Sequence, residues 1–206
     1  MFNRNLRDIV GFDLDSVIAN TDYALDRYIR AEFGISLDWH NIYEYKIENF
    51  PELTDEMKSQ TLNDIHNGVI LFDIEPYDSI IEDLKNLRSE GINLFIVTSR
   101  PANLFPMTSK WLKENDIMYD GLFFTESSKK YEVVKACGLK CFVEDRDDIL
   151  ESIYTNCGEL VYGSYLVDHP WNRLCSNPCI SRVSNASEAV ERILHRRGDY
   201  YVKGEM

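Results

Sequence analysis

Acidic side chains follow two apolar segments that lie far apart in the sequence. Asp13 and Asp15 end the first segment, and Glu144 and Asp145 end a later one. A carboxylate that attacks phosphorus forms an acyl phosphate, which water then hydrolyses, so one difficult step becomes two. A second carboxylic acid can protonate the leaving oxygen and later take a proton from water. We therefore expect Asp13 to be the nucleophile of a phosphohydrolase and Asp15 to be its acid and base.

A second set of polar residues could hold the phosphate group. Thr98 and Ser99 follow an apolar segment, and Lys130 opens a helical one, with Lys129 as the alternative lysine. An ammonium group would offset charge on the transferring phosphoryl group, and hydroxyl and amide groups near Thr98 would donate hydrogen bonds to its oxygens. We expect Thr98, Ser99 and Lys130 to bind phosphate, although both hydroxyl residues could instead cap the helix that follows.

The acidic residues also predict a metal site. Carboxylates gathered at one place repel each other unless a cation binds among them. The candidate ligands are hard oxygens without His or Cys nearby, which favours magnesium over zinc. We therefore expect Mg²⁺ as the cofactor. Arg100 is a further cation in this region, and it could bind phosphate or pair with Asp145.

Apolar and amphipathic segments alternate along most of the chain. This alternation predicts parallel strands joined by crossover helices, which is an α/β fold with a doubly wound, Rossmann-like sheet. Ligands bind beyond the carboxyl ends of such strands, so the polar residues that follow them should converge. After the first strand at residues 8–15, we expect strands at 93–98, 121–124, 141–144 and 161–167 and helices at 79–90, 103–115, 129–137, 147–156 and 187–197.

A long insert separates the first strand from the rest of the sheet. We expect residues 20–75 to form a small helical cap, with helices at 23–32 and 55–67, and residues 1–19 and 76–206 to form the core. Most aromatic residues of the insert should pack in its own core. As a group they could also line a pocket for a flat apolar group. They are Tyr23, Tyr28, Phe33, Trp39, Tyr43, Tyr45, Phe50 and Phe72.

Composition limits the partners and the location of the protein. The net charge of −13 argues against a nucleic-acid polymer as partner, although a small anionic substrate is possible. No apolar run is long enough to span a bilayer and no signal peptide is evident, so we expect a cytoplasmic location without membrane contact. The five cysteines are expected to be reduced thiols. Cys175 and Cys179 lack the partners that a zinc site would need.

At these residues the sequence resembles the haloacid dehalogenase superfamily of phosphohydrolases. Four motifs match in order: DLDSVIANT from Asp13, IVTSR, SKKYEVV and FVEDRDD. Each motif alone is weak, but four in order at expected strand ends are specific. The resemblance implies that Asp13, the backbone carbonyl of Asp15 and Asp145 hold Mg²⁺. Glu144 stands where the family usually has Asp, so it could reach the ion directly or through water.

Within that superfamily the chain is most similar to the 5′(3′)-deoxyribonucleotidase-like group. The insert position and the segments LFDIEPYDSI, TSRP and VDHPWNR carry this likeness. It implies nucleoside monophosphates as substrates, with cap aromatics or Phe72 against the base. Ser16 replaces the usual Gly and should tighten the turn after the acids.

Other functions remain open from the sequence. One enzymatic alternative is a phosphatase of sugar or other small-metabolite phosphates. Non-enzymatic alternatives are a receiver-like domain, which would not explain the insert, and a degenerate phosphate-binding domain, which would not need Asp15. The natural substrate, the choice between 5′ and 3′ phosphates and the oligomeric state are not encoded in any motif we identify.

Overall fold

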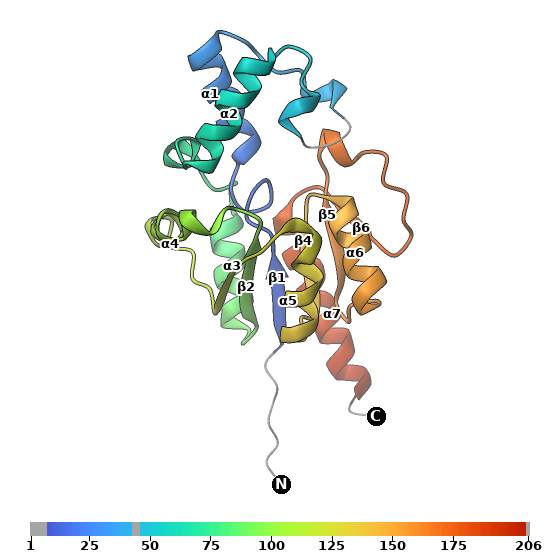
Figure 1. Cartoon of the computed structure of the whole chain (residues 1–206). Coiled ribbons are helices and arrows are strands. Elements are labelled where there is room, and N and C mark those ends of the chain that lie inside the picture. The colour runs from blue at the N-terminus through green and yellow to red at the C-terminus, as the bar shows by residue number, and fades with distance from the viewer. Residues whose placement is uncertain (1–7, 43–45, 205–206) are drawn as a thin grey trace.

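Six parallel strands form a single sheet at the centre of the protein (Figure 1). The computed structural model describes residues 8–42 and 46–204. The strands lie in the order β3-β2-β1-β4-β5-β6, and every neighbouring pair is parallel. Their bounds are β1 Ile9–Phe12, β2 Asn93–Thr98, β3 Gly121–Phe124, β4 Cys141–Glu144, β5 Gly163–Val167 and β6 Ser181–Val183. The expected α/β fold with a parallel sheet is confirmed.

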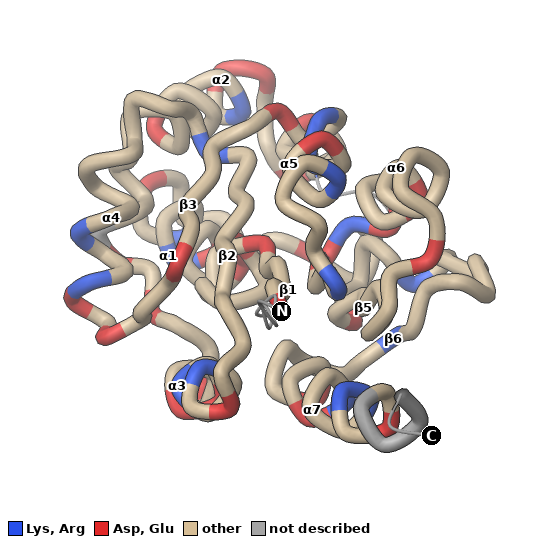
Figure 2. Tube along the Cα trace, turned by 90° about the horizontal axis from the view of Figure 1, so that it is seen from below, with Lys and Arg blue, Asp and Glu red and all other residues tan. Residues whose placement is uncertain are grey.

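Helices cover both faces of this sheet. Figure 2 shows α3 and α7 together on one face and α5 and α6 on the opposite face. The helices of the core are α3 Ile80–Ser89, α4 Phe105–Glu114, α5 Lys130–Cys137, α6 Asp147–Cys157 and α7 Ala186–Gly204. Because both faces are covered, the inner strands β4 and β5 are buried along their whole length, whereas β3 and β6 at the two edges are only partly buried. No helix of the described residues is both long and apolar enough to cross a bilayer.

Residues 20–75, here called the cap insert, lie beyond the carboxyl ends of the strands (Figure 1). The insert contains α1 Thr21–Phe33, η1 Trp39–Asn41, η2 Ile47–Asn49, α2 Asp55–His66 and η3 Ile70–Asp73. Its two ends are joined at the base, where the amide of Asn20 donates to Glu75 O at 2.8 Å and that of Tyr77 to Ile18 O at 3.0 Å. The division into two domains at these positions stays a prediction.

The structure differs from the expected elements mainly near the C-terminus. The strand β6 was not among the expected elements, because its 3 residues are too few for an alternating pattern to stand out. The strand expected from residue 161 begins at Gly163, which has a positive φ of 103°. Asn185 caps α7, because its side-chain oxygen accepts the Glu188 amide at 2.9 Å.

Candidate active site

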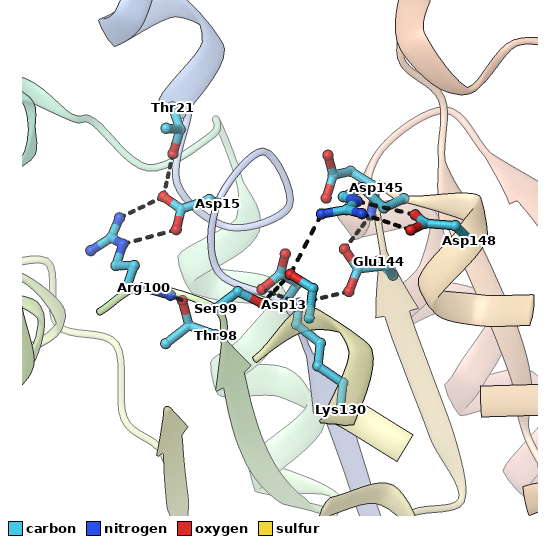
Figure 3. Close-up of polar contacts among 12 residues, drawn as sticks. Asp13, Asp15, Thr21, Thr98, Ser99, Arg100, Lys130, Glu144, Asp145 and Asp148 are labelled. Carbon is cyan, nitrogen blue, oxygen red and sulfur yellow. Dashed lines mark hydrogen bonds and ion pairs between the residues drawn. The ribbon is translucent and has the colours of Figure 1, made fainter. Parts of the chain in front are cut away.

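Two neighbouring strands bring distant carboxylates to one lysine. The chain leaves β1 at Asp13, whose amide still donates to Val143 O of β4 at 2.8 Å. Lys130 Nζ then lies 2.8 Å from Asp13 Oδ1 and 2.7 Å from Glu144 Oε2. All three side chains are buried. The lysine therefore bridges the acids that follow β1 and end β4 (Figure 3).

Asp145 adds a third carboxylate to this group. One carboxylate oxygen from each of Asp13, Glu144 and Asp145 lies within 4.8 Å of the others. Burial, followed by the charges of its acidic neighbours, raises the pKa of Asp13 well above its usual value. Burial also raises the pKa values of Glu144 and Asp145 to about 7 each. The lysine pKa is raised because its two carboxylate partners outweigh burial.

This acid cluster, Asp13, Glu144 and Asp145, fits a divalent cation. Three carboxylates face one ammonium group, so the cluster lacks positive charge when all its acids are ionised. Asp13 Oδ1 is buried and forms an ion pair with Lys130, but no hydrogen-bond donor of the described residues meets it in good geometry. An all-oxygen ligand set matches the preference of Mg²⁺. The expected direct or water-mediated role of Glu144 stays a prediction.

Asp15 lies in a different environment from Asp13. Arg100 forms a fork with it, from Nε to Oδ2 at 2.9 Å and from Nη2 to Oδ1 at 2.7 Å, and Thr21 Oγ1 donates to Oδ1 at 2.6 Å. Burial acts to raise the pKa of Asp15, but the Arg100 guanidinium lowers it overall. The sequence suggested phosphate or Asp145 as the partner of Arg100. In the structure its carboxylate partner is Asp15, which no motif indicated.

The residues expected to bind phosphate divide into two groups. Ser99 and Lys130 line a cavity together with Asp13, Asp15 and Asp145. Thr98 is fully buried, and its Oγ1 accepts the Arg100 amide at 3.2 Å. The helical segments that follow begin at Ala102 and Phe105 without a side-chain cap, so Thr98 does not cap them, and its role in phosphate binding stays a prediction.

Two neighbours of this group were not among the expected site residues. Ser127 donates to Ser99 at 2.9 Å, and both Ser127 and Arg146 line the cavity. Arg146 also pairs with Asp148, with Nη2 2.6 Å from Oδ2. No spacing pattern in the sequence singles out either residue.

The cavity has a volume of about 230 Å³. Its floor carries the polar residues, and its upper wall comes from the cap insert and is mainly aliphatic. The insert residues that line it beyond Thr21 are Leu25, Ile65, His66, Ile70, Leu71 and Ile74. The side chain of Phe72, the expected base contact, lies outside the described part of the structure.

The described aromatic residues of the insert lie away from this wall. Tyr28 packs edge-on against Phe33 with ring centroids 6.2 Å apart, and Trp39 packs against Phe50 at 5.0 Å and against Trp171 of the core at 5.6 Å. Tyr43 and Tyr45 are outside the described residues. These four aromatics therefore pack as expected, whereas Tyr23 is 55% exposed, and the described wall is aliphatic instead of aromatic.

Ser16 has the backbone conformation that its position suggested. Its φ is 57°, in the left-handed region that favours glycine. The Ser16 amide donates to Ala19 O at 2.8 Å, and its carbonyl accepts from His169 Nε2 at 2.8 Å. A tight turn therefore follows the two acids, held from the loop after β5. His169 therefore fixes this turn to the loop that follows β5.

Comparisons with known proteins agree with this architecture. No protein-family model matches the chain. The chain is similar to the nucleotidase of Clostridium acetobutylicum, with 27% identity over 194 residues that cover 89% of this chain and 94% of the relative.

Solved structures show the same fold. A haloacid dehalogenase family hydrolase from Deinococcus radiodurans with bound phosphate and sodium matches with a TM-score of 0.61 and 15% identity, covering 93% of this chain and 96% of that one. A structure from Clostridium acetobutylicum described as a predicted phosphatase matches with a TM-score of 0.60 and 16% identity, covering 92% and 99%.

Taken together, the comparisons show which known fold this protein has. Its fold is that of solved haloacid dehalogenase hydrolases, so the fold that the four motifs implied is confirmed. The sequence relative is named a nucleotidase and one structural neighbour a predicted phosphatase, which agrees with the expectation of a phosphoric monoester hydrolase. Within the class, the chain's likeness in sequence is to a nucleotidase.

Proposed function

We propose that the protein hydrolyses phosphate monoesters, with nucleoside monophosphates as its substrates. One observation carries the proposal: the Asp13 carboxylate lies on the floor of a cavity, beside Lys130 and the carboxylates of Glu144 and Asp145. A receiver-like or merely phosphate-binding role is less well supported, because neither would require a walled cavity with Asp15 on its floor.

Asp13 begins the reaction in this proposal. Its carboxylate attacks phosphorus and forms an aspartyl phosphate, and the alcohol departs. Lys130, held beside Asp13, offsets charge on the phosphoryl oxygens, and the Ser99 hydroxyl on the cavity wall can donate to one of them. Water then hydrolyses the aspartyl phosphate and restores the free carboxylate.

Asp15 handles the protons of both steps. It gives a proton to the leaving oxygen and takes one from the attacking water. The Arg100 fork favours its carboxylate form, so the observed geometry suits the second step, in which Asp15 accepts a proton. For the first step, Asp15 must carry a proton despite the guanidinium, or leave the fork.

The acid cluster would hold Mg²⁺. Bound there, the ion would neutralise charge on the transferring phosphoryl group. Asp13 and Asp145 would be direct ligands together with the Asp15 carbonyl, and Glu144 would bind directly or through water. The cluster geometry supports the three carboxylates in this role.

The wall that the cap insert contributes to the cavity indicates which substrates fit. An aliphatic surface formed by residues such as Ile65, Ile70 and Leu71 can pack against the face of a nucleobase. A sugar phosphate would need partners for many hydroxyl groups, and His66 is the main polar side chain that the insert offers beyond Thr21. The wall therefore favours a nucleotide over a sugar or other small-metabolite phosphate, in line with the name of the sequence relative.

A phosphate-release screen tests the proposal. Purified protein is assayed on nucleoside 5′- and 3′-monophosphates, sugar phosphates and other small phosphate esters, with Mg²⁺ and with a chelator. We expect Mg²⁺-dependent release that is fastest from a nucleotide and is lost in Asp13→Asn. Equal activity of this variant would refute the mechanism, and a clear preference for sugar phosphates would refute the substrate class.

A matched pair of variants tests the wall itself. Ile65→Asn should raise the KM for the preferred nucleotide without affecting release from a phosphate ester that has no base. Ile153→Val, a conservative change in the buried core away from the cavity, serves as the control for stability.

A further inference from the structure

The loop after β5 holds the acid cluster from behind. The indole Nε1–H of Trp171 donates to Asp145 Oδ2 at 3.0 Å, and both side chains are buried. A buried carboxylate accepts such a bond at a defined angle, so the indole limits how the Asp145 carboxylate can rotate. Trp171 thus touches a candidate metal ligand without being a candidate ligand itself.

Asn172 holds the backbone of the same ligand. Its Nδ2 donates to Asp145 O and to Val167 O, each at 2.7 Å. Its Oδ1 accepts from Arg182 Nη1 at 2.7 Å and from the His169 amide at 3.2 Å. Both donors and both acceptor positions of the amide are therefore used, which fixes the side chain in one orientation.

Aromatic neighbours hold the indole of Trp171 in place. The His169 ring stacks on it with centroids 4.2 Å apart and an interplanar angle of 7°. Trp39 of the cap insert packs on it at a centroid distance of 5.6 Å and is itself packed against Phe50. The donor that faces Asp145 therefore has little freedom to move.

We propose that Trp171 is a positioning residue for the metal ion, which orients the Asp145 carboxylate before the ion binds. A ligand that is already oriented loses less freedom on binding, and such outer partners typically contribute about 10–100-fold to metal affinity. The inference rests on the proposed metal site and gives Trp171, which lies in the VDHPWNR segment, a role that the segment by itself does not indicate. Because Trp171 packs against Trp39, it also links the cap insert to the metal site.

Mn²⁺ binding to Trp171→Phe tests the inference without relying on activity. Phenylalanine keeps most of the buried ring and removes only the N–H donor. Binding is followed by the electron paramagnetic resonance signal of free Mn²⁺ during titration of the metal-free protein. We expect about a 10-fold weaker affinity. In phosphate release, the Mg²⁺ concentration for half-maximal activity should rise by a similar factor, with kcat largely restored at saturating Mg²⁺.

Trp111→Phe is the matched control. Trp111 is also buried and also donates its indole N–H, to Ile74 O at 2.7 Å, but it does not contact the acid cluster. The Trp111→Phe variant should bind Mn²⁺ with the same affinity as the wild type. Unchanged Mn²⁺ affinity in a folded Trp171→Phe would overturn the inference, and so would an equal loss in both variants.

Asp145→Ala separates the inference from the proposed metal site. If the wild type binds no Mn²⁺, or binds it as Asp145→Ala does, the metal site itself is wrong. Should Trp171→Phe fail to fold, benzothienylalanine can replace the indole N–H by sulfur in a Trp39→Phe, Trp111→Phe background, whose remaining tryptophan is Trp171. The same loss of Mn²⁺ affinity relative to that background is then expected, and no loss would overturn the inference.

Discussion

Asp13 and Asp15 are separated by one residue, yet their surroundings have opposite electrostatic character. Asp13 shares a single ammonium group with Glu144, and Asp145 adds a further carboxylate close by. Asp15 has a guanidinium to itself, in a two-point fork. The pKa of Asp13 is raised and the pKa of Asp15 is lowered.

The difference shows how one short loop can supply two kinds of carboxylate. The environment of Asp13 is short of positive charge, so a cation completes it. The Asp15 side chain already has its counter-charge in Arg100, so this carboxylate can serve in proton transfer while only the backbone carbonyl of Asp15 would bind the metal ion. The change from one environment to the other takes place across Leu14, and the tight turn at Ser16, whose φ is 57°, follows both acids.

The largest expected effect comes from removing the nucleophile. Asp13→Asn should lower kcat by on the order of 10⁴-fold or more, because no covalent intermediate can form. Rapid-quench assays should detect phosphorylated protein in the wild type and none in the variant. Asp148→Asn, which changes an exposed carboxylate paired with Arg146, is the control and should keep its activity. Phosphorylation of Asp13→Asn would place the nucleophile elsewhere.

Asp15→Asn should have a smaller effect that depends on the leaving group. Loss of a general acid typically costs about 10²–10⁴-fold. A nucleoside needs a proton to depart, whereas p-nitrophenolate does not, so formation of the phosphoenzyme from p-nitrophenyl phosphate should be nearly unaffected. Single-turnover kinetics on both substrates measure the difference. An equal loss on both would mean that Asp15 does not act as the acid.

Asp145→Asn should affect stability in two opposite ways. Without metal it should raise the melting temperature, because it relieves repulsion in the acid cluster, by about 2–4 °C for each kcal/mol gained. The substitution should also abolish the rise in melting temperature that Mg²⁺ causes in the wild type. Thermal unfolding with and without Mg²⁺ measures both effects. Asp15→Asn is the contrasting variant and should lower the melting temperature, since it leaves Arg100 without its partner charge.

The smallest expected effect is a pH dependence of the metal-free protein. The pKa values of Asp145 and Glu144 are raised to about 7, so the folded state binds more protons than the unfolded chain between about pH 4 and pH 7. The free energy of unfolding should therefore fall as pH rises through this range. The Mg²⁺-induced gain should be larger at pH 8 than at pH 5, because the ion must displace those protons. Equal Mg²⁺-induced gains in the free energy of unfolding at pH 5 and pH 8 would contradict this prediction.

Much of the fold could be predicted because it depends on local pattern. The apolar segments that form β2, β3 and β4 are continuous and either end in a polar residue or are followed by one, so their bounds match the expected ranges. Parallel strands place their carboxyl ends together, which is why Asp13, Lys130 and Asp145 could be expected at one edge.

The side-chain partnerships could not be predicted in the same way. Arg100 and Asp15 are 85 residues apart, and their pairing depends on the direction in which the chain leaves β1 and β2. Trp39 packs against Trp171 because of the orientation of the insert relative to the core. Neither the direction of the chain nor the orientation of the insert can be read from a local pattern of apolar and polar residues.

The joined base of the cap insert has a consequence for how such a protein can change. Ala19 and Pro76 pair in an isolated antiparallel bridge, so the insert leaves and rejoins the core at almost one point. Closing a loop costs only slightly more free energy as the loop lengthens. A different lid could therefore be grafted between these two residues while the chemistry beneath it stayed intact, so substrate preference and bond cleavage can evolve, or be engineered, as separate traits.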